Sequence, residues 1–189
     1  MEHILVKIRE RIDTMLAENE RLIVSIDGRC GSGNTTLAAE LKRVYSCGLI
    51  HMDDFFLRPE QRTAERLARP GENVDHERFL QEVLLPLSAG KSFSYRPFSC
   101  SSGTLTAPVS VSPGRITVVE GSYSCHPQLR GFYDLRIFLS TKNESQLRRI
   151  TERSGARSAA VFAGRWIPLE EKYFSGCDVL NCCDMYFET

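Results

Sequence analysis

The sequence predicts an α/β fold in which a doubly wound, mainly parallel five-stranded sheet carries helices on both faces. Five short apolar runs alternate with segments of helical periodicity, and strands separated by helices pair in parallel through right-handed crossovers. The first apolar run also leads through a glycine-rich loop directly into a helix-like segment. One interruption is expected, because residues 92–112 alternate about a Ser/Gly turn, as in a small antiparallel hairpin insertion.

The expected strands and helices follow from hydrophobic periodicity along the chain. Strands are expected at residues 21–27, 47–52, 115–121, 135–139 and 184–187. Helices are expected at residues 2–19, from the glycine loop to about 45, after 75, from 142 to about 153, and around 157–164 and 168–174. Asp75 is a good N-cap, and Thr141 to Glu144 match a capping box. With 189 residues, the chain is expected to form a single domain, residues 1–189.

Composition and charge argue against several classes of protein. The 24 basic and 24 acidic residues give a formal net charge of zero, so a nucleic-acid partner is not expected. No run of 18 apolar residues is present, so no membrane partner is expected, and charges near the N-terminus argue against a secretory signal. The seven scattered cysteines include no C-x-x-C pair, which favours reduced thiols in a cytoplasmic protein. A homo-oligomer stays open.

The glycine-rich loop matches the pattern G-x-x-x-x-G-K-[ST] except at the lysine, where this chain has Asn34. Such a loop directs backbone N–H groups at a phosphate, and the following helix adds its positive end. We therefore expect ATP, or another nucleoside triphosphate, and Mg²⁺ as cofactors, with the Thr35 hydroxyl suited to the metal. The expected nucleotide-binding residues are Gly28, Arg29, Cys30, Gly31, Ser32, Gly33, Asn34, Thr35 and Thr36. The alternative is a glycine-rich turn without a ligand.

Three carboxylates follow predicted strands, at the end of the sheet where α/β proteins bind ligands. Asp53 and Asp54 follow the second strand, and Glu120 ends the third. Phosphorylating a hydroxyl needs a group that accepts its proton and a metal that holds the phosphates. Both aspartates could instead cap the segment after them. Glu120 needs a cation or another partner if it is buried, so a salt bridge to an arginine is the alternative to a metal-side role.

The loop and three later segments together resemble the uridine kinase family of P-loop kinases. The matching segments are residues 26–38, 51–56, 118–121 and 146–153, and the resemblance spans about residues 21–175. It implies a P-loop NTPase-type fold and transfer of the ATP γ-phosphate to a hydroxyl of a nucleoside or similar small molecule. It also implies Asp53 as the general base, with Glu120 and Asp54 on the Mg²⁺ side through water.

The same resemblance implies an arginine-rich lid at about residues 142–166. Arg149, Arg153 and Arg157 recur every four residues, so a continuous helix aligns them, and Arg149 and Arg153 are the expected catalytic arginines. Gly155 is a candidate hinge, and a solvated helix face is the alternative. For the acceptor we expect a pocket with aromatic and polar side chains. The candidate substrate residues are Phe56, Tyr95, Arg96 and His51.

Two departures from the family pattern leave the function open. The segment after Tyr95 lacks the acidic residue and histidine that the family uses for its nucleoside, so the acceptor is undetermined. Asn34 brings no charge to the phosphates, and by analogy with other transition-state charge groups the loss costs ~10²–10⁵ in rate. The alternatives are a catalytically silent, regulatory nucleotide-binding protein and a nucleoside monophosphate kinase. The latter would need further arginines, such as Arg58, Arg62, Arg66 and Arg69.

Overall fold

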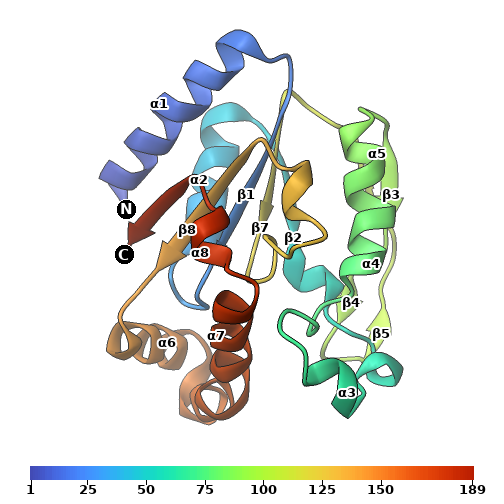
Figure 1. Cartoon of the computed structure of the whole chain (residues 1–189), viewed down its shortest axis with the longest axis vertical. Coiled ribbons are helices and arrows are strands. Elements are labelled where there is room, and N and C mark those ends of the chain that lie inside the picture. Colours follow the sequence, from blue (N-terminus) through green and yellow to red (C-terminus); the bar gives the residue numbers. More distant parts are fainter.

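The computed structural model describes residues 1–189 and contains a five-stranded sheet in the order β2-β7-β1-β8-β9 (Figure 1). The strands are β1 (Leu22–Gly28), β2 (Gly48–His51), β7 (Ile116–Glu120), β8 (Leu135–Ser140) and β9 (Met185–Glu188). Every neighbouring pair is parallel. The predicted α/β class and parallel sheet are confirmed, and each predicted strand ends within one residue of the observed one.

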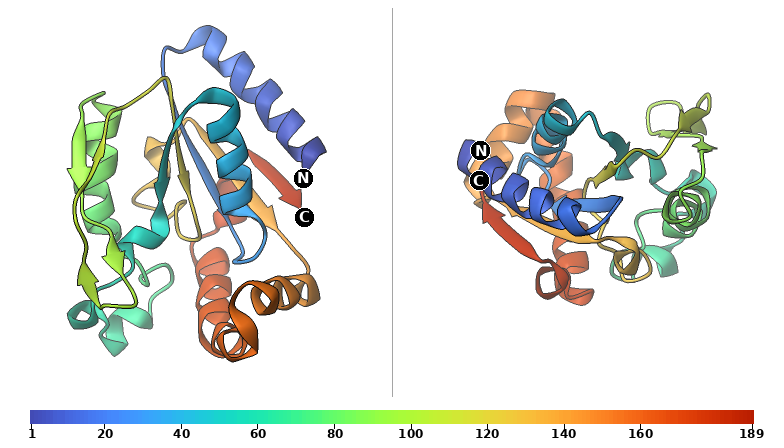
Figure 2. Two further views of the ribbon diagram at one scale, coloured as in Figure 1. Left: turned by 180° about the vertical axis from the view of Figure 1, so that it is seen from behind. Right: turned by 90° about the horizontal axis from the view of Figure 1, so that it is seen from above.

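Helices cover both faces of the sheet, because alternate strand residues are apolar on both sides (Figure 2). On one face, α1 (Glu2–Glu18) and α2 (Asn34–Tyr45) pack on the side chains of Val24 and Ile26. On the other face, Ile23 of β1 belongs to the core that includes α7 (Ile167–Gly176) and α8 (Val179–Cys182). No helix has both the length and the apolar character needed to cross a bilayer.

The remaining helices are short or irregular. They are α3 (Ala64–Leu67), α4 (His76–Phe79), a π-helix at Leu80–Leu84, α5 (Leu85–Ser88), α6 (Asn143–Val161), a π-helix at Phe162–Trp166, and 3-10 turns at Met52–Phe55, Pro59–Gln61 and Arg130–Phe132. Asp75 caps α4 as predicted, since its carboxylate accepts the N–H of Arg78 at 3.2 Å. The predicted capping box is wrong: no side chain caps α6, and Thr141 Oγ1 donates to the carbonyl of Thr189.

The predicted hairpin insertion is present as two short antiparallel ladders. Strand β3 (Phe93–Tyr95) pairs with β6 (Val109–Val111), and β4 (Phe98–Ser99) pairs with β5 (Thr104–Leu105). The hairpin lies beside α4 and α5, away from the central sheet (Figure 2). The buried side chain of Tyr95 in this hairpin belongs to the core on the sheet face that α7 and α8 cover. All seven cysteines are free thiols.

A candidate nucleotide-binding site

A cavity of about 970 Å³ lies at the carboxyl ends of the parallel strands, between the glycine loop, α6 and α7. Twelve of the predicted site residues line it: Cys30, Gly31, Ser32, Gly33, Asn34, Thr35, Thr36, Asp53, Phe56, Glu120, Arg149 and Arg153. Six lie outside the lining: Gly28, Arg29, His51, Asp54, Tyr95 and Arg96. The cavity therefore brings together the loop, one carboxylate from each of two strand ends, and two arginines.

The glycine loop takes its shape from left-handed backbone at Gly31 (φ 77°) and Gly33 (φ 101°), which glycine adopts without strain. The N–H of Ser32 turns inward to the carbonyl of Arg29 at 3.0 Å, whereas no protein acceptor binds the N–H of Gly31 or Gly33. The first turn of α2 adds further N–H groups without helical partners. These donors and the positive helix end form an arrangement that suits a phosphate.

Asn34 is folded back into the loop. Its side chain is buried, its Oδ1 accepts a hydrogen bond from Ser32 Oγ at 3.0 Å, and its Nδ2 lies 3.4 Å from the carbonyl of Gly28. A lysine at this position would carry its charge several bonds further from the backbone. The loop of this chain is thus closed by a short neutral amide, and no cation comes from this position.

The metal side of the site is a chain of three side chains. Thr35 Oγ1 donates to Glu120 Oε2 at 3.1 Å, and Glu120 Oε1 lies 2.5 Å from His51 Nδ1. The hydrogen bond from Glu120 raises the pKa of His51. Glu120 is 5% exposed, and no arginine contacts it, so the alternative of a salt bridge to an arginine is wrong. A hydroxyl and a carboxylate facing the cavity are the hard oxygen ligands that Mg²⁺ prefers, so the donor set fits this ion.

The two aspartates after β2 point to different surroundings. Asp53 lines the cavity, where desolvation and the charge of Glu120 raise its pKa to about 6. Asp54 faces the hairpin: its Oδ2 accepts the hydroxyl of Tyr95 at 3.0 Å, and Arg78 donates to its carbonyl. Neither carboxylate caps the 3-10 turn at Met52–Phe55. Asp53 is therefore placed to act on a bound molecule, and Asp54 is placed to hold the hairpin.

The four predicted acceptor residues do not form one surface. Phe56 lines the cavity, whereas Tyr95 is buried, with its ring 5.1 Å from that of Phe55 and its hydroxyl on Asp54. Arg96 donates to the carbonyls of Thr106 and Leu105 inside the hairpin. His51 is engaged by Glu120. The placement supports an acceptor role for Phe56 alone among the four.

The arginines of α6 do not share one face. Gly155 takes φ 81° and ψ 161°, which breaks the helix between Arg153 and Arg157, so the expected alignment of Arg157 is wrong. Arg149 and Arg153 both line the cavity. Arg149 Nη1 donates to the carbonyl of Gly31 at 3.0 Å and to the hydroxyl of Thr189, so it braces the loop. Arg153 lies over the ring of Phe162, and its guanidinium is the less constrained of the two.

Two buried carboxylates near the site, Asp27 and Glu170, were not predicted from the sequence. Asp27 Oδ1 accepts the N–H of Gly28 at 2.7 Å, and its Oδ2 accepts the hydroxyl of Tyr173 and the N–H of Cys125. Glu170 of α7 accepts the N–H of Cys30 at 3.1 Å. Burial raises the pKa of each to about 7. The position of Asp27 at the end of a buried strand was a usable signal, while Glu170 on a half-exposed helix offered none.

Comparisons with known proteins place this fold among kinases. No family model matches the chain. The chain is 30% identical over 179 residues to the bifunctional α-galactosidase/sucrose kinase AgaSK of Mediterraneibacter gnavus; the match covers 82% of this chain and spans about a fifth (19%) of that protein.

Two solved structures share the fold. A protein from Bacillus stearothermophilus described as a possible uridine kinase has a TM-score of 0.65 at 20% identity, over 96% of this chain and 99% of its own. YFH7 of Saccharomyces cerevisiae, described as a candidate P-loop kinase with a circular permutation, has a TM-score of 0.69 at 12% identity, over 100% and 98% of the two chains. The chain shares the fold of these proteins, and the predicted resemblance to uridine kinase-like P-loop kinases is confirmed for the fold.

Proposed function

We propose that this protein is an ATP-dependent phosphotransferase that moves the γ-phosphate of ATP to a hydroxyl of a small molecule. One observation carries the proposal: the glycine loop, the Thr35–Glu120 pair and Asp53 all face a single cavity. Phosphate donors, metal ligands and a proton acceptor are the parts that phosphoryl transfer requires.

Each group has a role that its surroundings suit. The loop N–H groups and the helix end would hold the β- and γ-phosphates. Thr35 and Glu120 would hold Mg²⁺, which would supply positive charge to the phosphates. Asp53 accepts the proton of the acceptor hydroxyl, since a carboxylate with a pKa of about 6 is both ionised and basic near neutral pH. Arg153 approaches the transferred group when residues 142–166 close as a lid.

The acceptor is a polyhydroxy compound, either a nucleoside or a sugar. The cavity wall away from the loop combines the aromatic side chains of Phe56, Tyr123 and Trp166 with the polar Asn73, which suits a ring that carries hydroxyls. One relative is described as a sucrose kinase and one solved structure as a possible uridine kinase. The monophosphate alternative is weaker, because Arg58, Arg66 and Arg69 already pair with acids and only Arg62 of the four lines the cavity.

A second candidate is a catalytically silent nucleotide-binding protein, and Asn34 favours it. The substitution removes the one cation that P-loop kinases place on the phosphates from within the loop, and the amide is engaged inside the loop. Nucleotide binding through backbone N–H groups and the metal does not depend on that cation. Turnover is the property that separates the two candidates.

The deciding experiment compares the natural chain with Asn34→Lys in a coupled assay of ADP release. Nucleosides and simple sugars are offered one at a time with Mg·ATP, and ATP binding is measured in parallel. Because one transition-state charge is restored, we expect turnover in Asn34→Lys to exceed that of the natural chain by ~10²-fold or more. Asn34→Gln, which adds length and no charge, is the matched control and is expected to stay at the natural rate.

Two outcomes would contradict the proposal. If both forms bind ATP and neither turns over any acceptor, the phosphotransferase is excluded and the catalytically silent nucleotide-binding protein remains. No detectable binding of Mg·ATP to either form would remove both candidates. Equal turnover in the natural chain and Asn34→Lys would instead show that another group, such as Arg153, replaces the missing cation.

A further inference from the structure

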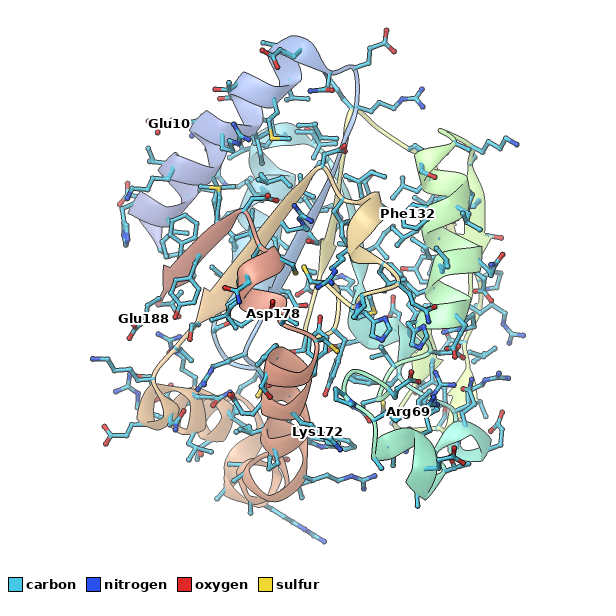
Figure 3. All side chains as sticks on the ribbon, in the orientation of Figure 1. Glu10, Arg69, Phe132, Lys172, Asp178 and Glu188 are labelled. Carbon is cyan, nitrogen blue, oxygen red and sulfur yellow. The ribbon has the colours of Figure 1, made fainter.

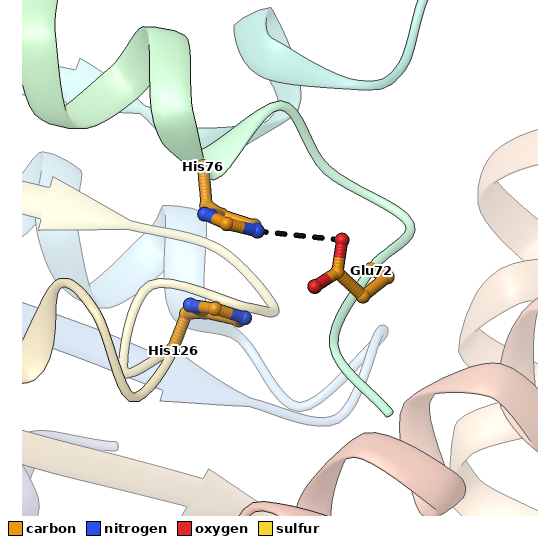
Figure 4. A group of neighbouring side chains, drawn as sticks. All are labelled: Glu72, His76 and His126. Atoms are coloured by element: carbon orange, nitrogen blue, oxygen red, sulfur yellow. Dashed lines mark ion pairs between the residues drawn. The ribbon is translucent and has the colours of Figure 1, made fainter. Parts of the chain in front are cut away.

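A second cluster of ionisable side chains lies outside the cavity, between the segment before α4 and the loop after β7. It consists of Glu72, His76 and His126, whose candidate ligand atoms all lie within 4.8 Å of one another (Figure 4). The two imidazole rings stack with centroids 4.1 Å apart and an interplanar angle of 13°. His76 Nε2 lies 3.4 Å from Glu72 Oε2. Two imidazoles and a carboxylate at one point are a typical ligand set for Zn²⁺.

Burial makes this cluster unlike a chance meeting of surface residues. His76 is 2% exposed and His126 is 4% exposed. Neither ring nitrogen of His76 has a hydrogen-bond partner, and a buried polar group costs stability when it stays unpaired. Glu72 Oε2 also accepts no hydrogen bond, although it lies 3.2 Å from Arg66 Nε in an ion pair. The backbone adds a further constraint, because a Cβ on Gly71 (φ 80°) would lie 3.2 Å from His126 Nε2. The chain thus buries two imidazole rings, and that of His76 has no hydrogen-bond partner in the protein.

We propose that Glu72, His76 and His126 form a binding site for one Zn²⁺ ion. The ion takes the Nε2 lone pair of each ring and one oxygen of Glu72, and water completes the tetrahedral set. Zn–N bonds of about 2.0–2.1 Å bring the two Nε2 atoms to about 3.3 Å, so the rings tilt towards the ion from their stacked positions. His126 Nδ1 then carries the ring proton and gives up its long 3.3 Å contact with the N–H of Gln128.

Two acids and two guanidinium groups surround the cluster, so a bound cation would replace Arg66 as the partner of Glu72 Oε2. Glu77 Oε1 lies 3.6 Å from His76 Nε2 and is close enough to replace the water ligand. Arg66 pairs with both Glu72 and Glu77, and Arg69 approaches Glu72 at 3.9 Å from the solvent side.

The ion would join two walls of the large cavity. Glu72 and His76 flank Asn73, and His126 follows Tyr123 by three residues; Asn73 and Tyr123 both line the cavity. The chain just before this segment is already tied to α7, since Lys172 donates to the carbonyl of Ala68. Figure 3 labels Lys172 on α7 and Arg69, the residue after Ala68. Bound zinc would thus fix the wall formed by Asn73 and Tyr123. This inference does not depend on which reaction the cavity supports.

The test titrates zinc into the whole chain after chelator treatment, by calorimetry in a non-chelating reductant. We expect one equivalent to bind, with a rise in Tm of roughly 5–10 °C at a hundredfold excess over Kd. His76→Phe keeps the stacked ring and removes the ligand, so its affinity should fall by about tenfold or more. His126→Phe should behave in the same way, and far-UV circular dichroism checks that both variants fold.

Two controls separate this site from other zinc ligands in the chain. His3→Gln removes an exposed histidine on α1, and Cys183→Ser removes a thiol near Cys125; both should bind zinc like the natural chain. Cobalt should bind without the strong near-ultraviolet absorption of a thiolate ligand. Absence of binding at micromolar zinc would overturn the proposal. Binding that survives both histidine changes would also overturn it. If a histidine variant does not fold, Glu72→Gln provides the same comparison.

Discussion

Asp53 has surroundings that suit a general base, and its neighbour Asp54 does not. The two residues are consecutive, yet the carboxylate of Asp53 faces the cavity and that of Asp54 holds the hydroxyl of Tyr95. The difference comes from the 3-10 turn after β2, which directs successive side chains to different sides. The family resemblance implies a base role for Asp53 and a metal-side role for Asp54. The turn geometry leaves Asp53 at the cavity and takes Asp54 out of its lining, which no sequence pattern shows.

We expect Asp53→Asn to lower kcat by ~10²–10⁴ while ATP affinity stays unchanged, because general-base catalysis contributes about that much. Whichever form turns over, natural or Asn34→Lys, is the background for the measurement. With a pKa of about 6, the base is protonated at low pH, so kcat/KM should rise with pH up to about 6 and then level off. The Asp53→Asn variant should lose this rise.

Asp54→Asn is the matched control for that experiment. It lies one residue away, outside the cavity lining, and its amide can still accept the Tyr95 hydroxyl. Its kcat should stay within a few-fold of the parent. A larger loss of kcat in Asp54→Asn than in Asp53→Asn would show that our proposal assigns the general base to the wrong residue.

At the scale of elements, α6 is the least regular part of the site. Its sequence has helical periodicity on both sides of Gly155. A single glycine within such a pattern does not by itself predict a break in the helix. The structure places the break there, with backbone that only glycine adopts easily. The segment proposed as a lid is therefore divided at Gly155, and the part before the break carries Arg149 and Arg153.

Gly155→Ala should destabilise the protein by about 1 kcal/mol, because the new Cβ meets open space and the cost comes only from the left-handed backbone. Urea unfolding measures the change. Gly164→Ala is the control, since its Cβ also meets open space and its backbone is helical. That variant should be neutral or slightly more stable. Equal destabilisation of both would show that the strain at Gly155 is unimportant.

What the sequence predicted well was local or periodic. The strands followed from apolar runs, and the loop followed from glycine spacing, because both patterns act over a few residues. The predicted capping box failed, since Thr141 found a tertiary partner in Thr189. Asp27 contacts Cys125 and Tyr173, and Glu170 contacts Cys30, over separations of 98 to 146 residues along the chain. No local sequence pattern contains such information.

At the scale of the whole molecule, the buried acids make stability depend on pH. The pKa of Glu170 is about 7 in the folded chain against an ordinary 4.5, so the folded state keeps a proton that the unfolded state has released. The contribution of Glu170 to the free energy of unfolding is therefore greatest below about pH 4.5, and it falls as the pH rises to about 7. Asp27, whose pKa is raised to about 7 from 3.8, acts in the same direction.

The nucleotide-free protein should thus lose stability between pH 5 and pH 8, and Glu170→Gln should reduce that loss by on the order of 1–3 kcal/mol. Urea midpoints at the two pH values give the measurement. Glu171→Gln, one residue further along α7 and paired with Arg29 at the surface, should keep the full decline. A natural chain that gains stability from pH 5 to pH 8 would contradict the assignment.

The carbonyl groups of the phosphate loop show when this loop can form. Three consecutive ones, at residues 30, 31 and 32, are held by Gln146, Arg149 and Thr189, which lie 116, 118 and 157 residues further along the chain. Contacts of such separation form late in folding, because long stretches of chain must be ordered first. The shape of the loop therefore depends on two distant parts of the chain, α6 and the residue just after β9, and a change in either should reach the phosphate donors.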